Sequence, residues 1–332
     1  MSRSWRTKAL RFTLLLVTTL CCSQVSRAQN DIENVLTDLL FITRGYIQPA
    51  AEASLFQSST GWVDRAAVLP RGEYRIAAHA NALFIPQGEQ SYVVRNDQLR
   101  NARLRDTDVA VIPTALGGDT NQFLDFEILG EQFELQAFEG VKIDVLPHVY
   151  LQGAVGLGYN SQLTLRYAPS VPFGKSSYGI LGAGLQHEFT SYLGDLPFRV
   201  SGAISYATFN LDLQFDAFTF ESTTTGFTIF SADAAVIDAS SWTYQLAVSK
   251  QLGRHNVWGA MVYTHGQIEY SLDGPENLFL TTLNRVIDLL DETQRAGKVD
   301  VGYTYQSDHW RITSTLSSGQ FINLHLGVGY RL

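Results

Sequence analysis

The sequence has 332 residues, of which 24 are basic and 32 are acidic, giving a formal net charge of −8 at neutral pH. An acidic chain repels nucleic acid and anionic head groups, so the charge argues against a polynucleotide partner. Only 17% of the residues are charged, 12% are aromatic and 27 are glycine, a composition that favours a strand-rich protein.

Residues 1–28 have the three-part order of a secretory signal peptide. Basic residues precede an apolar run, Phe12 to Cys22, and a small-residue site follows at Ser26-Arg27-Ala28. The apolar run is too short to cross a bilayer as a helix, so we expect the segment to be removed on export. Cys21 and Cys22 leave a lipid-attachment site open, although the residues before them are not small. Cleavage after Ala28 leaves a chain without cysteine and hence without disulfide bonds.

Residues 29–60 follow a helical period. Apolar side chains recur at spacings of three and four, at Ile32, Val35, Leu36, Leu39 and Leu40. Asp31 can cap the start of a helix, and Pro49 should kink or end it. We therefore predict one or two amphipathic helices, which are a candidate plug for a barrel.

From residue 61 to residue 332 the period is two. Tyr74, Ile76 and Ala78, for example, alternate with Arg75 and His79. Many of these runs reach the roughly 9–11 residues that a tilted strand needs to cross a bilayer. In a transmembrane barrel the apolar face meets lipid, so the polar residues are predicted to face the lumen. The candidates are Arg75, His79, Glu134, Lys142, Asp212 and Asp216.

The lengths of the connections favour a barrel over a soluble antiparallel sandwich. Short turns are predicted at 146–148, 194–197, 253–256 and 306–309, and long segments at 86–130, 168–178, 217–240 and 271–296. Alternation of short and long connections is typical of outer-membrane barrels. We place ten strands at 72–85, 131–146, 148–168, 178–192, 197–216, 241–252, 255–270, 297–306, 309–317 and 321–332. The count rises to twelve or fourteen if 86–130 or 217–240 contains a hairpin.

The chain ends on FINLHLGVGYRL, in which every second residue is apolar up to the terminus. A closed barrel has no free edge, so its last strand pairs with the first and its outward residues meet lipid along their whole length. Tyr330 and Leu332 also resemble the insertion signal that barrel-assembly machinery reads, although the usual last residue is Phe. The alternative is the C-terminal strand of a soluble protein.

Several features carry a resemblance to known proteins. They are the signal sequence, the helical segment from Asp31, the pair Gly61-Trp62, the stretch Pro113–Gly117 and the terminal strand. Together they resemble a family of uncharacterised outer-membrane β-barrel proteins of Gram-negative bacteria. More distantly, the layout is similar to the long-chain fatty-acid transporter superfamily, whose members plug a fourteen-strand barrel with an N-terminal segment. The ten strands counted here depart from that pattern.

The sequence contains no complete motif for catalysis or for a cofactor. Gly174-Lys175-Ser176 resembles the end of a phosphate loop, but Pro169 stands where that loop requires glycine. The histidines lack zinc-ligand spacing, and no Gly-x-Ser-x-Gly elbow is present. A serine and a histidine on neighbouring strands can still meet, which leaves an enzymatic barrel open. We predict no enzyme, no cofactor and no metal.

The predicted fold is therefore all-β, an antiparallel transmembrane β-barrel with an N-terminal amphipathic helical segment. We expect it in the outer membrane, in contact with lipid and with the barrel-assembly machinery. Its polar inner face indicates a channel or transporter for small molecules, and the resemblance implies a hydrophobic cargo. The alternative is a structural or surface-interaction barrel with a closed lumen that binds through its outer loops.

Overall fold

The computed structural model describes residues 33–332, apart from 129, 174–175, 227, 288–291 and 332. The expected signal peptide, residues 1–28, lies outside the described residues. Among those residues, no helix combines the length and the apolar character needed to span a membrane.

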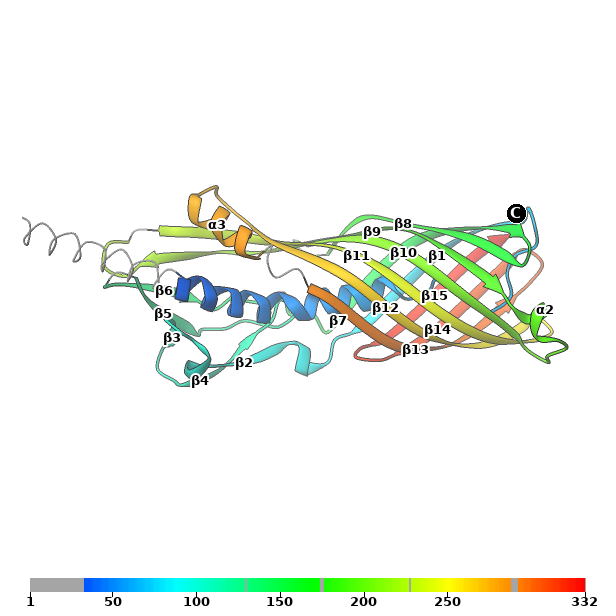
Figure 1. Cartoon of the computed structure of the whole chain (residues 1–332), viewed down its shortest axis with the longest axis horizontal. Helices are drawn as coiled ribbons and strands as arrows, with labels where there is room; N and C mark the ends of the chain where they lie inside the picture. Colours follow the sequence, from blue (N-terminus) through cyan, green and yellow to red (C-terminus); the bar gives the residue numbers. More distant parts are fainter. Residues whose placement is uncertain (1–32, 129, 174–175, 227, 288–291, 332) are drawn as a thin grey trace, which may run out of the picture.

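Ten antiparallel strands close into a barrel (Figure 1). In their order around the wall they are β1 (Tyr74–Phe84), β7 (Val145–Gly158), β8 (Ser161–Phe173), β9 (Ser176–Glu188), β10 (Arg199–Ser222), β11 (Thr228–Leu252), β12 (His255–Asp273), β13 (Glu292–Gln306), β14 (Trp310–Ser318) and β15 (Ile322–Arg331). The last strand pairs with the first over its whole length, from Arg75 opposite Arg331 to Phe84 opposite Ile322. This confirms the predicted fold class and the count of ten strands.

The count is right although two of the predicted strands are wrong. Residues 146–148 are not a turn, because Pro147 lies within β7 and pairs with Ala82 of β1. The turn comes later, at Tyr159 and Asn160, whose φ angles of 51° and 55° suit a tight hairpin. The predicted strand 148–168 is therefore two strands. The predicted strand 131–146 is not a wall strand, so the two errors cancel.

The two longest connections, residues 85–144 and 274–291, lie at one end of the barrel, which we call the loop end, together with three short ones (Figure 1). The other end, the turn end, has only short connections, and the predicted long segment 168–178 is wrong because β8 and β9 cover nearly all of it. The loop end carries β2 (Ser91–Arg95), β3 (Arg103–Leu104), β4 (Val109–Pro113), β5 (Phe123–Ile128), β6 (Glu131–Gln136), the short helices η1 (Gln87–Glu89) and η2 (Asn96–Gln98), and α3 (Leu278–Ile287). The turn end carries α2 (Thr190–Leu193). The predicted loop 217–240 is mostly strand, because β10 and β11 extend past the rest of the wall as a long hairpin.

The N-terminal helix, residues 33–58, runs from the loop end into the barrel (Figure 1). It passes through Pro49 without ending. Its buried apolar side chains belong to one large core with residues of β3–β6, of α3 and of the loop-end halves of the wall strands. The helix residues of this core are Val35, Leu39, Ile42, Tyr46, Ile47, Ala50, Ala51, Ala53, Leu55 and Phe56.

The two faces of the terminal strand β15 differ as the sequence predicts. Its outward side chains are apolar and exposed, at Ile322, Leu324, Leu326, Val328 and Tyr330. Its inward side chains include Asn323 and His325, both almost fully buried. The outward belt of the wall continues in the same way around the barrel, with exposed Leu, Val, Ile and aromatic residues on each strand.

Candidate functional site

The interior of the barrel is occupied by the end of the N-terminal helix and by residues 59–73, which we call the lumen segment. The backbone amide of Ala66 donates to Oγ of Ser249, and that of Leu69 donates to Oε1 of Gln162, both at 3.1 Å. The chain thus passes through the interior from the loop end to the turn end before β1 begins.

Arg166 of β8 holds the point where the helix ends. It is 1% exposed and donates Nη1 to the carbonyl of Ser58 and Nη2 to that of Thr60, both at 2.8 Å. Its guanidinium carbon lies 3.9 Å from the ring centre of Trp62 and 4.2 Å from that of Tyr150. A buried cation is stable only when its donors are paired, so these contacts fix the helix end to the wall.

Lys298 of β13 is a second cation at the same helix end. Its Nζ donates to Oγ1 of Thr60 at 2.5 Å and to the carbonyl of Phe56 at 3.5 Å, and it lies 3.8 Å from the carboxylate of Asp300. The last carbonyls of a helix have no partner within the helix and attract positive charge. Two wall cations therefore add to the cap that Ser59, Thr60 and Trp62 provide for the same carbonyls from within the chain.

Glycines of β9 make room for Trp62. A Cβ atom added at Gly182 would lie 2.8 Å from the indole ring, and one added at Gly184 would lie 3.1 Å from it. Glycine inside a strand often marks such a close approach. The glycine-rich run of this strand is thus the sequence signal for the side chain that packs against it.

At the turn end, Asp64 of the lumen segment contacts two arginines of the wall. Arg75 of β1 donates Nη1 to its Oδ2 at 2.7 Å, and Arg311 of β14 donates Nη1 to the same atom at 3.2 Å. Both arginines are buried. Arg75 was predicted from the alternation of its strand, but Arg311 and Asp64 were not, because no local pattern shows which strands will be neighbours where the barrel closes.

Other buried polar atoms of the wall make no hydrogen bond to another described residue. They include both ring nitrogens of His148, both side-chain amide atoms of Asn323 and the hydroxyl of Ser317. Buried polar groups are ordinarily satisfied by protein or by ordered water. This part of the lumen, between β14, β15 and β7, is therefore expected to be hydrated.

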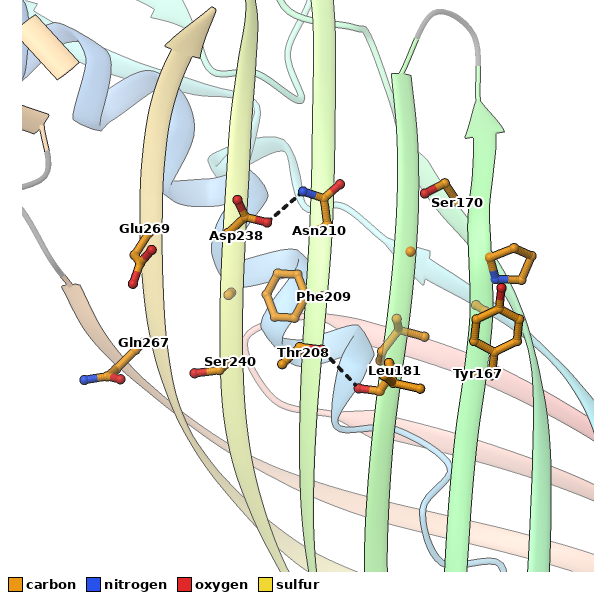
Figure 2. Close-up of a pocket in the computed structure, with 15 residues that line it drawn as sticks. Tyr167, Ser170, Leu181, Thr208, Phe209, Asn210, Asp238, Ser240, Gln267 and Glu269 are labelled. Atoms are coloured by element: carbon orange, nitrogen blue, oxygen red, sulfur yellow. Dashed lines mark hydrogen bonds between the residues drawn. The ribbon is translucent and has the colours of Figure 1, made fainter. Parts of the chain in front are cut away.

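The polarity of the wall reverses toward the loop end. Toward the turn end, the outward side chains of the wall are apolar. The last apolar row before the reversal contains Tyr206, which pairs with Trp242. Closer to the loop end, the outward side chains of β10 to β12 are mostly polar, and together with Tyr167 and Leu181 they line a groove of about 530 Å³ on the outer surface (Figure 2). Within this groove, Nδ2 of Asn210 donates to Oδ1 of Asp238 at 2.7 Å. An aromatic row that separates an apolar belt from a polar rim is typical of a membrane boundary.

The residues predicted to face the lumen fall into different places. Arg75 and His79 are buried on the inner side of β1, and Nδ1 of His79 lies 2.8 Å from Nε2 of His325. Glu134 lies in β6, outside the ring of ten strands, where its carboxylate pairs with Arg105 at 2.7 Å.

Two of the three remaining candidates do not face the lumen, and the side chain of the third is outside the described part of the structure. Lys142 is exposed in a connection, with a φ of 51°, and belongs to no strand. Asp212 lies in β10 between the buried Leu211 and Leu213, so its side chain is on the outer face. The prediction is wrong there because the apolar face of β10 at this level packs on the helix core and not on lipid. The side chain of Asp216 lies outside the part that the structure describes.

The proposed insertion signal is described only in part. Tyr330 is exposed on the outer face, stacked on His309 and packed edge-on against Trp310. Leu332 lies outside the described residues. The role of both residues in assembly stays a prediction.

Comparison with known proteins places the chain in a family. The profile of a family of unknown function, DUF6588, matches residues 7–332. No curated protein matches the sequence. Similar solved structures include the attachment invasion locus protein Ail of Yersinia pestis, with 9% identity, a TM-score of 0.26 and coverage of 79% of this chain and 99% of that one.

Two other similar structures are also barrel proteins. The translocator domain of the autotransporter NalP of Neisseria meningitidis has 11% identity, a TM-score of 0.35 and coverage of 86% of this chain and 95% of its own. The COG4313 outer-membrane channel of Pseudomonas putida F1 has 10% identity, a TM-score of 0.32 and coverage of 80% and 98%. At these identities the likeness concerns the fold alone. None of the three is a fatty-acid transporter, so the expected likeness to that superfamily stays a prediction.

Proposed function

The chain belongs to DUF6588, a family of unknown function, and from its own geometry we propose that it is a gated outer-membrane channel or transporter for small molecules. In this proposal the helix and the lumen segment, residues 33–73, form a plug, and the loop end faces the outside of the cell. The observation that carries the proposal is the way in which the plug is held inside the barrel.

At the level of the apolar outer belt, the plug is held to the wall by hydrogen bonds and by a small apolar cluster of Val63 and Ala66 with residues of β11 and β12. Arg166 and Lys298 bind backbone carbonyls and a hydroxyl of the helix end, and Gln186 donates Nε2 to the carbonyl of Arg65 at 2.8 Å. Each such bond has a modest net free energy, because water can replace either partner. A plug held by exchangeable polar contacts is suited to move in a way that a sealed apolar core is not.

The chemistry of the lining favours a small polar solute. The wall at this level presents Ser, Thr, Gln, Asn, His and Arg side chains to the interior, and several of their polar atoms lack a protein partner among the described residues. A hydrated polar lumen suits a polar solute better than the hydrophobic cargo that the resemblance to fatty-acid transporters implied.

Conductance in planar lipid bilayers tests the proposal. We expect the whole protein to be mostly closed with brief openings, and Arg166→Met to raise the open fraction because the helix end loses two donors. Arg254→Met is the matched control, since that arginine is 63% exposed, pairs with the exposed Asp308 and makes no side-chain hydrogen bond or ion pair with the plug in the described part of the chain. A heat-dependent mobility shift on a gel verifies that each variant is folded.

The second candidate is a surface-interaction barrel with a closed lumen. It is favoured by the large folded region at the loop end, where β2–β6 pack with the helix in one apolar core. In that case Arg166→Met destabilises the protein but both variants remain electrically silent. Silence of a folded Arg166→Met variant would therefore replace the first proposal by the second.

A further inference from the structure

The cluster of arginines around Asp64 carries one more inference. Three guanidinium groups meet at the turn end of the lumen: Arg75 and Arg311 from the wall, and Arg65 from the lumen segment. Arg65 and Arg311 share one acceptor, Oε1 of Gln306, at 2.7 and 3.2 Å. We call these three residues the arginine cluster.

The arginine cluster has more positive charge than its surroundings balance. Asp64 is the one carboxylate bonded to it among the described residues. The nearby pairs Arg199 with Glu188 and Arg331 with Glu73 are each neutral in themselves. One donor, Nε of the buried Arg311, has no hydrogen-bond partner in the described part of the chain. Three cations and one anion leave the capacity to bind a further negative charge.

The position of the cluster makes it reachable from the turn end. Arg75 is the second residue of β1, Arg311 is the second residue of β14, and Gln306 is the last residue of β13. The side chain of Asp64 keeps 12% of its surface exposed, although both wall arginines are more deeply buried. A small solute at this mouth meets the cluster before it meets the rest of the lumen.

We propose that Arg75 and Arg311 form an oxyanion site that is occupied by the plug's own carboxylate, Asp64, and that a carboxylate or phosphate group of a solute competes for it. Guanidinium groups bind carboxylate and phosphate oxygens through the same fork of donors, so the exchange replaces one charge-assisted pair by another. Asp64 is then a latch that keeps the lumen segment against the wall, and the anion releases it. This inference rests on the proposed plug, but the latch can operate whether or not a solute crosses the barrel.

Chemical labelling of the lumen segment tests the latch. The chain has two cysteines, Cys21 and Cys22, which are replaced by serine before Val63→Cys is introduced next to the latch. Val63 is 2% exposed, so a water-soluble maleimide should react slowly while the latch is closed. We expect inorganic phosphate, and more weakly acetate, to raise the labelling rate by roughly fivefold or more over chloride at equal ionic strength. If Val63→Cys does not fold, Ala66→Cys provides a second buried position in the same segment.

Two further variants separate the anion site from the latch. Asp64→Asn should label rapidly without phosphate, and phosphate should raise its melting temperature more than that of the parent, because the arginines no longer have their internal anion. Arg311→Gln should lose the response to phosphate. Equal labelling in phosphate and chloride, or a full phosphate response in Arg311→Gln, would overturn the proposal. If labelling depends on phosphate but the barrel stays silent in bilayers, the result would support the latch. It would contradict only the proposed transport function.

Discussion

The interior of this barrel has two zones that hold the same helix in different ways. In the zone toward the turn end, the wall presents polar side chains and the helix end is bound by Arg166 and Lys298. In the zone toward the loop end, the wall presents Phe209, Ile237 and other buried apolar residues that pack on the helix. The first zone is held by hydrogen bonds and a small apolar cluster around Val63 and Ala66, whereas the second is held by one large apolar core.

The difference follows from what lies outside the wall. Along β10, the small side chains of Ser205 and Ala207 point into the barrel. Tyr206, between them, is exposed on the apolar outer belt. A few residues further on, Leu211 is buried and the outward face is polar. The strand does not change its geometry, because its pairing with β9 and β11 continues in register across this point. A continuous strand can therefore exchange the polarity of its two faces where it leaves the membrane and enters water.

The largest expected effect concerns the polar zone. Arg166→Met removes a charged donor from the carbonyl of Ser58 and from that of Thr60, which keep only Nε1 of Trp62 and the hydroxyl of Tyr150 as donors. Hydrogen bonds to a charged group contribute about 1.5–3 kcal/mol each, so losing two of them costs roughly 3–5 kcal/mol. We expect a reduction of about this size in the free energy of unfolding, measured by urea titration of the protein in lipid vesicles. Arg254→Met, at an ion pair with Asp308 in which both side chains are exposed, should cost less than about 1 kcal/mol. Similar losses in both variants would contradict the view that Arg166 holds the plug.

A somewhat smaller effect is expected on the outer face of the polar zone. Leu326 of β15 is 59% exposed there, so Leu326→Arg places a charge against the middle of the bilayer at a cost of roughly 2–4 kcal/mol. Leu326→Ala is the control, because it shortens the side chain without adding charge. His325→Arg is unsuitable as a control, since His325 is buried against His79 at 2.8 Å. An arginine that is tolerated as well as alanine would show that this face does not meet lipid.

Much of the barrel was predictable because its signals are local. The alternation in β15 and the turns at 194–197, 253–256 and 306–309 depend on residues adjacent in the sequence, and the structure has them as predicted. The turn at Tyr159 and Asn160 was missed, and Pro147, which lies within β7, was mistaken for part of a turn.

The candidate site was less predictable because its contacts are distant in the sequence. Arg166 binds the carbonyl of Ser58, and Arg311 binds Asp64, across separations of 108 and 247 residues. Arg75 and His79 could be selected from alternation alone, since they lie where the outer belt is apolar. The orientation of Asp212 could not be predicted from alternation, because the rule that apolar residues face lipid does not hold beyond the membrane boundary.

The smallest effect expected here distinguishes the two zones most directly. Leu211 and Asp212 are neighbours on β10 in the apolar zone, with Leu211 buried inside and Asp212 on the outer face. Leu211→Ala should cost about 2–3 kcal/mol, because it leaves a cavity beside the helix core. Asp212→Ala should change the free energy of unfolding by no more than about 0.5 kcal/mol, because one oxygen of this half-buried carboxylate has no hydrogen-bond partner among the described residues. Both are measured by urea titration in vesicles, with bilayer conductance recorded alongside.

If Asp212 instead faced the lumen, as its alternation first suggested, Asp212→Ala would alter the ion selectivity of any open channel. Leu211 would then face lipid, and Leu211→Ala would have little effect on stability. That reversed result would mean that the outer face of β10 is still apolar at Leu211 and Asp212. The membrane boundary would then lie closer to the loop end than these residues.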